Sequence, residues 1–149
     1  MKTSVAVTAE VSIVDGGGQD TRGHSANAER VRAIAAKHRE SAIELAACGD
    51  SAGLAELELA RVAELHAIAY DELALAATAC AEIRLHTRHS PPWIDALVRA
   101  FVAARHAEAS RERAAAIVAP TAVEMRRHEQ AAAAAERRAS QAWQEPWAA

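Results

Sequence analysis

The stretch SAGLAELELARVAELHAIAYDELALAATACAEIRLHTR, residues 51–88, decides the fold. After Gly53 it contains neither Pro nor Gly, and no other run free of both residues is as long. Mostly apolar side chains recur in it at alternating steps of three and four residues, which places them on one side of an α-helix. The members of this stripe are Leu59, Val62, His66, Ala69, Leu73, Ala76, Cys80 and Ile83. The spacing predicts one continuous helix about 55 Å long, at 1.5 Å per residue.

A second apolar set lies beside this stripe and widens the apolar side of the helix. Its members are Leu54, Leu57, Leu65, Ile68 and Leu75. A helix of this kind gains most of its stability in water from packing rather than from propensity. We therefore expect the other segments of the chain to pack against it.

The composition indicates an all-α protein with a thin core. The chain has 149 residues, which suits one domain. Apolar residues make up 51% of it, but Ala dominates them and aromatic residues are only 3%. Ala is the best helix former and contributes little buried area. The composition favours long helices packed side by side as in a coiled coil, or an oligomer.

The segment before residue 51 predicts a helix and a tight turn. We expect the helix to start near Asn27, with Ser25 or Asn27 as its cap. Its stripe is Val31, Ile34, His38, Ala42 and Leu45. Gly49 suits the end of this helix, and Asp50 or Ser51 can cap the next one. So short a connection predicts an antiparallel hairpin.

Two further helices are predicted after residue 88. Ser90 and Pro91 are typical of a helix start, and this third helix covers about residues 91–119. Pro120 interrupts it. Thr121 and Glu124 have the spacing of a capping box, which predicts a fourth helix over about residues 122–143.

The N-terminal residues differ from the rest of the chain. Apolar side chains alternate with others between residues 3 and 14, a pattern that predicts a short β-strand. The apolar positions that we expect to bind a partner are Val5, Val7, Val11 and Ile13. A single strand leaves its backbone groups unpaired, so we expect it to pair with another chain; the alternative is a disordered tail. Gly16–Gly18 form a flexible joint after it.

The predicted architecture is therefore a four-helix up-down bundle of long Ala-rich helices with a short N-terminal β-strand arm. Residues 1–24 form the arm and its Gly-rich linker, and residues 25–149 form the bundle. Trp143 and Trp147 stand at the end of an otherwise aromatic-poor chain. They either pack back on the bundle or anchor into another subunit or partner.

Charge is distributed unevenly along the chain. Residues 40–82 hold nine carboxylates against Arg61 alone, a net charge of −8. Residues 84–138 hold ten Arg against six carboxylates, a net charge of +4. We interpret this as two halves that neutralise each other across antiparallel helices. A basic face for an anionic partner is the alternative, but the basic half is interleaved with acids and is poor in aromatic residues for base stacking.

No catalytic, metal or nucleotide motif stands out, so we assign no catalytic residue, metal ligand or cofactor. His38 and His66 lie on stripes of neighbouring helices, too far out of register to share one metal ion. The pairs Glu82–His86 and Glu124–His128 are read as surface hydrogen bonds, because di-metal bundles use Glu-x-x-His instead. Residues 86–89, next to Pro91, are read as a solvated loop; a small anion site is the alternative.

Our leading hypothesis is a non-enzymatic structural or assembly protein that oligomerises or docks on a partner through the strand arm and helical faces. A component of a phage particle, shell or filament fits this description. The first alternative is a helical-bundle enzyme or a cofactor- or metal-binding protein. The second is a nucleic-acid-binding module that uses the Arg-rich third and fourth helices.

The expected location is the cytoplasm, or a particle assembled there. Cys48 and Cys80 are too far apart along the helices for a disulfide, which suits a reducing compartment. No signal peptide and no membrane span is predicted.

Overall fold

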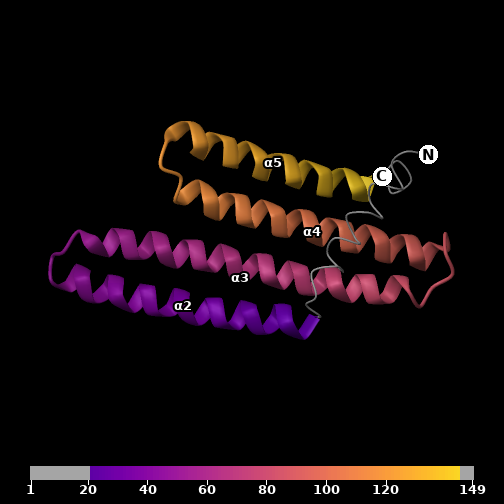
Figure 1. The fold of residues 1–149 in the computed structure, drawn as a ribbon, viewed down its shortest axis with the longest axis horizontal. Helices are drawn as coiled ribbons and strands as arrows, with labels where there is room; N and C mark the ends of the chain where they lie inside the picture. Colours follow the sequence, from indigo (N-terminus) through magenta and orange to yellow (C-terminus); the bar gives the residue numbers. More distant parts are fainter. Residues whose placement is uncertain (1–20, 145–149) are drawn as a thin grey trace.

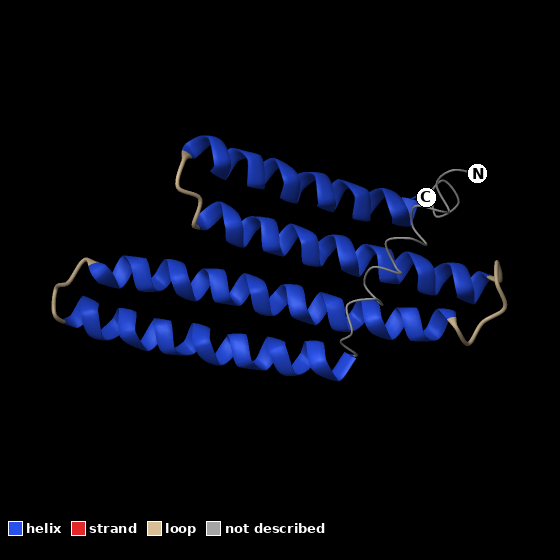
Figure 2. Ribbon diagram, in the orientation of Figure 1, coloured by secondary structure: helices blue, strands red, loops and turns tan. Residues whose placement is uncertain are grey.

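The computed structural model describes residues 21–144 and contains four helices within that range. They are α2 (Thr21–Ala47), α3 (Ala52–Ile83), α4 (Pro91–Ile117) and α5 (Ala122–Gln144). The helices lie side by side, and each reverses the direction of the one before it (Figure 1). No strand occurs among the residues described (Figure 2), so the all-α prediction of four packed helices is confirmed. The strand expected at residues 3–14 lies outside the described residues, as does Trp147.

The helices are arranged as a single open layer. Contacts join α2 to α3, α3 to α4 and α4 to α5, and within residues 21–144 no other pair of helices is in contact. The two central helices therefore pack on both of their sides, whereas α2 and α5 each pack on one side. Both broad faces of the layer are left uncovered by any helix of the described part (Figure 1).

The turn between α2 and α3 lies where the sequence predicts it. Gly49 has a φ of 73°, a left-handed conformation that favours Gly. Its amide donates to the Ala46 carbonyl at 3.0 Å, and the Asp50 amide donates to the Leu45 carbonyl at 2.9 Å. This hydrogen-bond pattern is the Schellman motif. Asp50 rather than Ser51 caps α3, because its carboxylate accepts the Ala52 amide at 2.9 Å.

The capping box at α5 forms in a modified way. The Glu124 amide donates to the Thr121 hydroxyl at 3.2 Å, as a capping box requires. The Thr121 hydroxyl in turn donates to the Glu124 carboxylate at 2.9 Å, so the carboxylate binds the side chain. The predicted break at Pro120 and the new helix after it are confirmed.

Two helix boundaries were predicted wrongly. The first helix already includes Thr21, so Ser25 and Asn27 lie inside it rather than at its start. Its early residues are held by α3: His24 is buried, and the hydroxyls of Thr21 and Thr78 are 3.3 Å apart. The long helix ends at Ile83 rather than Arg88, because the chain must reverse to bring α4 back along α3. His89 completes that reversal with a φ of 64°.

Alanine fills most of the contacts between the helices, whereas Val98, Phe101 and Val102 of α4 form a buried cluster with Ala139 and Ala142 of α5. On α2 the buried residues Ala28, Ala35 and Ala42 are spaced by seven, the repeat of a coiled coil. A matching line on α3 consists of Gly53, Ala60, Ala67 and Ala74, all buried. A Cβ atom added to Gly53 would lie 3.0 Å from the Ala42 carbonyl oxygen, so the two backbones approach closely there.

The larger side chains lie mostly on the outside, which corrects the expectation for α3. In the second apolar set, Leu65 is half-buried and the other four members are exposed: Leu54, Leu57, Ile68 and Leu75. Leu59, expected on the main stripe, is exposed as well. The physical reason is that α3 has neighbours on two opposite sides, where alanines allow close approach. The leucines project from the faces between these contacts.

Candidate interaction surface

Ion pairs link the acidic α3 to both of its neighbours. On the α2 side, Arg32 pairs with Asp71 and Arg39 with Glu64. On the α4 side, Arg99 pairs with Glu82. This agrees with the interpretation that acidic and basic segments neutralise each other, although α2 supplies part of the positive charge. These ion pairs therefore join α3 to α2 and to α4.

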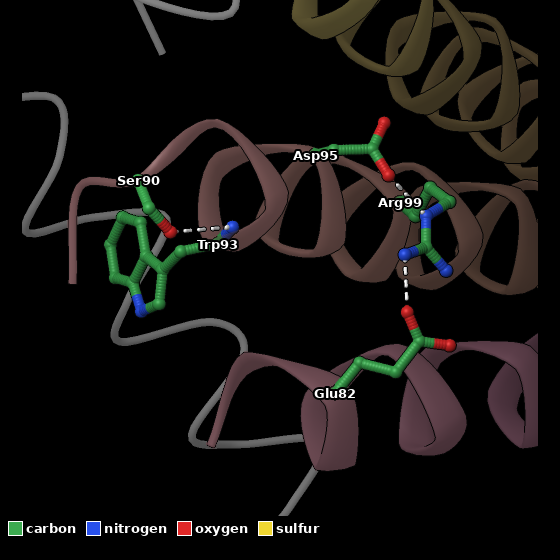
Figure 3. Close-up of polar contacts among 5 residues, drawn as sticks. All are labelled: Glu82, Ser90, Trp93, Asp95 and Arg99. Carbon is green, nitrogen blue, oxygen red and sulfur yellow. Dashed lines mark hydrogen bonds and ion pairs between the residues drawn. The ribbon is translucent and has the colours of Figure 1, made fainter. Parts of the chain in front are cut away.

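Figure 3 shows how Arg99 is held at the junction of α3 and α4. Its guanidinium donates to Glu82 on α3 and, at 2.9 Å, to Asp95 one turn earlier on α4. At the start of α4, the Ser90 hydroxyl accepts the Trp93 amide at 3.4 Å, the predicted cap. The hydrogen bond from Arg99 lowers the pKa of Glu82, whereas partial burial raises the pKa of Glu72, which lies on the same helix.

The opposite pKa shifts predict opposite effects of two isosteric substitutions. Because the pKa of Glu82 is lowered by folding, its contribution to stability is present at neutral pH and is lost as the pH falls through that lowered pKa. Glu82→Gln should therefore lower the melting temperature at pH 7 and leave it unchanged at about pH 2. Thermal unfolding followed by circular dichroism measures both values.

Glu72→Gln is the matched control for that experiment. The raised pKa of Glu72 means that folding disfavours its charged form, a penalty that appears as the pH rises through that pKa. The substitution should leave the melting temperature at pH 7 unchanged or higher. If both variants lowered it equally, the ion pair of Glu82 would not be the cause.

The two hairpins carry matching polar cross-links. Arg39–Glu64 joins α2 to α3, and Arg113–Glu136 joins α4 to α5 in the equivalent position. A His–Glu contact lies near each: His38–Glu56 at 2.7 Å and Glu112–His128 at 2.6 Å. A third, His106–Glu72 at 3.9 Å, lies between the hairpins. At least four of the seven His contact a neighbouring helix, because the ring of His24 on α2 also lies 6.4 Å from that of Tyr70 on α3.

This arrangement also corrects the interpretation of the pairs within single helices. Glu82 binds Arg99 rather than His86, and His128 binds Glu112 rather than Glu124. No group of three or more His, Cys, Asp or Glu in residues 21–144 is arranged to hold a metal ion. Cys48 is exposed, Cys80 is buried and both are free thiols.

The loop at residues 86–89 is exposed, as predicted. The ring of His89 lies 5.2 Å from that of Trp93, measured between ring centroids. Several Arg of α4 and α5 are engaged by carboxylates: Arg99, Arg105, Arg113 and Arg138. This engagement leaves less positive charge for a nucleic acid than the sequence alone indicates.

Four exposed apolar side chains lie on one side of α3 and are here called the leucine stripe: Leu54, Leu57, Ile68 and Leu75. Leu54, Ile68 and Leu75 occupy positions separated by multiples of seven, and Leu57 lies one turn from Leu54. Arg61 and Leu65 lie between them on the same side of the helix. Scattered single leucines on a surface are ordinary, but four on the same side of one helix favour an interaction site.

A pocket of about 210 Å³ opens beside the middle of the leucine stripe. Three helices contribute to it: its lining residues are Arg61, Leu65, Arg113, Ala116, Ile117, Met125 and Glu129. Its interior is mainly apolar, and the charged side chains give it a polar edge. Two exposed apolar residues, Val118 and Val123, lie close to it in sequence, around the turn between α4 and α5.

The first turns of α3 extend past the end of α4. In an antiparallel pair of helices, each step back along α3 matches one step forward along α4. Starting from the Glu72–His106 contact, Arg61 of α3 therefore lies opposite Ile117, the last residue of α4. Both residues line the pocket, which supports this register. Residues 52–60 of α3 therefore pack on α2 alone, and the turn between α2 and α3 projects beyond that between α4 and α5 (Figure 1). Leu54, at 69% exposure, lies on this projection.

The structure does not bring the predicted partner-binding residues to this surface. Trp143 is 53% exposed near the end of α5, whereas Met125 and Glu129 of the pocket lie near the start of that helix. Val5, Val7, Val11 and Ile13 fall outside the described residues. Sequence reasoning missed Arg61, Ile117 and Met125, because the pocket depends on a register between helices that no local motif encodes.

The chain matches no protein-family model, no curated protein and no solved structure. None of the helices in the described part combines the length and the hydropathy needed to cross a membrane.

Proposed function

We propose that the chain is a non-enzymatic structural protein that assembles with copies of itself. The observation that carries the proposal is the inverted placement of apolar side chains. Alanines fill most of the contacts between helices, while the leucine stripe is exposed on a face of the layer. A protein that worked alone would gain stability by burying these leucines, so their exposure favours a surface that is covered in an assembly.

The magnitudes favour a contact that buries more than one stripe. Full burial of a large aliphatic side chain contributes roughly 1.5–3 kcal/mol. The four members of the stripe are 47–69% exposed, so covering all of them contributes roughly 3–7 kcal/mol. Association costs about 4–15 kcal/mol in lost freedom, so one stripe alone barely offsets it. A symmetric contact between two stripes doubles the gain.

Residues 3–14 and the Trp tail add to this proposal as further contacts. An edge-to-edge strand pairing through Val5, Val7, Val11 and Ile13 would join copies or dock the chain on a larger particle, shell or filament. Trp143 and Trp147 would act as anchors. The proposed location is the cytoplasm or a particle assembled in it.

Light scattering of the full chain during size-exclusion chromatography tests the proposal. The chain mass is 15.8 kDa, and the expected result is a measured mass that rises above this value as the concentration rises. A mass of one chain at every concentration would refute self-assembly.

A further inference from the structure

The projecting start of α3 and the pocket lie next to each other on the same helix. Leu54 and Leu57 stand on the projection, beyond the end of α4, where only α2 supports the helix. Arg61 and Leu65 follow within three turns and form one wall of the pocket. One surface of the molecule therefore carries both a protruding apolar side chain, Leu54, and an open apolar pocket.

Two such surfaces fit each other when two copies of α3 lie antiparallel. A twofold axis between Leu59 and Ala60 places Leu54 of each copy at Leu65 of the other, which is the edge of the pocket. Leu54 then fills the space bounded by Ile117 and Met125 of the other copy. The contact is the same in both directions, as a twofold interface requires.

The same register brings opposite charges together. With Leu54 opposite Leu65, Glu58 of each copy lies opposite Arg61 of the other. Neighbouring carboxylates already have partners, since Glu56 binds His38 and Glu64 binds Arg39. Within residues 21–144, Glu58 and Arg61 make no ion pair or side-chain hydrogen bond. A register centred on Arg61 would instead place the two Arg61 side chains against each other.

We infer that two copies of this chain dimerise about this axis, each inserting Leu54 into the pocket between α3, α4 and α5 of the other. Two symmetric Glu58–Arg61 ion pairs fix the register. This inference rests on the proposed self-assembly and names its first contact surface. The remaining leucine stripe, Ile68 and Leu75, stays available for contacts beyond the dimer.

A charge exchange tests the register. Glu58→Arg and Arg61→Glu each place like charges together at both crossings, so each variant should weaken dimerisation at least about tenfold. The double variant restores opposite charges and should return the dimer to near its original affinity. Sedimentation equilibrium of the full chain at several concentrations measures each dissociation constant, and circular dichroism confirms that each variant keeps its helices.

A second pair of variants tests the insertion of Leu54. Leu54→Glu puts a charge into the apolar pocket of the other copy and should weaken the dimer about a hundredfold. Leu85→Glu is the matched control, because Leu85 is 81% exposed in the loop after α3 and takes no part in the contact. Both residues are exposed, so neither change should unfold the chain.

The outcomes separate this inference from the proposed function. If the unchanged protein stays monomeric at every concentration, both are refuted. If it self-associates but Leu54→Glu and the two charge reversals leave the dissociation constant unchanged, self-assembly stands and this surface is refuted. If single reversals weaken the dimer and the double variant fails to restore it, the Glu58–Arg61 register is refuted.

Discussion

Ala76→Leu is expected to destabilise the protein by about 3 kcal/mol, whereas Leu75→Ala, one residue earlier, should change stability by less than about 0.5 kcal/mol. Ala76 is 0% exposed and Leu75 is 60% exposed. Ala76 precedes Ile83 by one heptad, and Ile83 packs against the cluster that joins α3 to α4. A Leu side chain at position 76 would have to push these helices apart.

These two expected results reverse what is usual for a helical protein, in which replacing a Leu by Ala lowers the free energy of unfolding. Urea unfolding followed by circular dichroism at low protein concentration gives both free energies and avoids a contribution from association. A loss of several kcal/mol in Leu75→Ala would contradict the exposed placement of the leucines. Tolerance of Ala76→Leu would contradict the close alanine contacts.

Gly53→Leu is expected to lower the free energy of unfolding by about 2 kcal/mol or more. A Cβ atom added at this position would lie 3.0 Å from the Ala42 carbonyl oxygen, which belongs to the backbone and has little room to move. A Leu would separate α2 from α3 at the point where the hairpin is anchored. Thermal or urea unfolding measures the loss.

Two substitutions serve as controls for this effect. Gly53→Ala gains about 1 kcal/mol of helix propensity, which the tight contact offsets, so its net change should be small. Ala55→Leu, two residues later on an exposed part of α3, should be nearly neutral. Equal losses at positions 53 and 55 would show that the close approach of the backbones is not the cause.

The sequence predicts those parts of the fold that depend on neighbouring residues. Gly49 ends α2, Ser90 caps α4, and Thr121 and Glu124 start α5, because each acts through hydrogen bonds within a few residues. The end of α3 was missed because nothing local stops the helix before Arg88. Its end at Ile83 is set by the need to bring α4 back along α3.

The side of α3 that packs on α2 was missed for a different reason. Hydrophobic periodicity gives weight to Leu, Ile and Val, but the contact with α2 is made by Ala60, Ala67 and Ala74. A heptad of small residues is a weak signal in a chain where Ala is everywhere. The pocket could not be predicted at all, because it joins Arg61, Ile117 and Met125 from three helices.

The most direct test of the account compares the mass of the full chain with that of one variant. The variant carries Gln at all four positions of the leucine stripe: Leu54, Leu57, Ile68 and Leu75. Light scattering should give the unchanged protein a mass above 15.8 kDa at high concentration, and the variant a lower mass at the same concentrations with the same helical content. Equal masses for the two proteins at every concentration would contradict the claim that the exposed leucines exist for assembly.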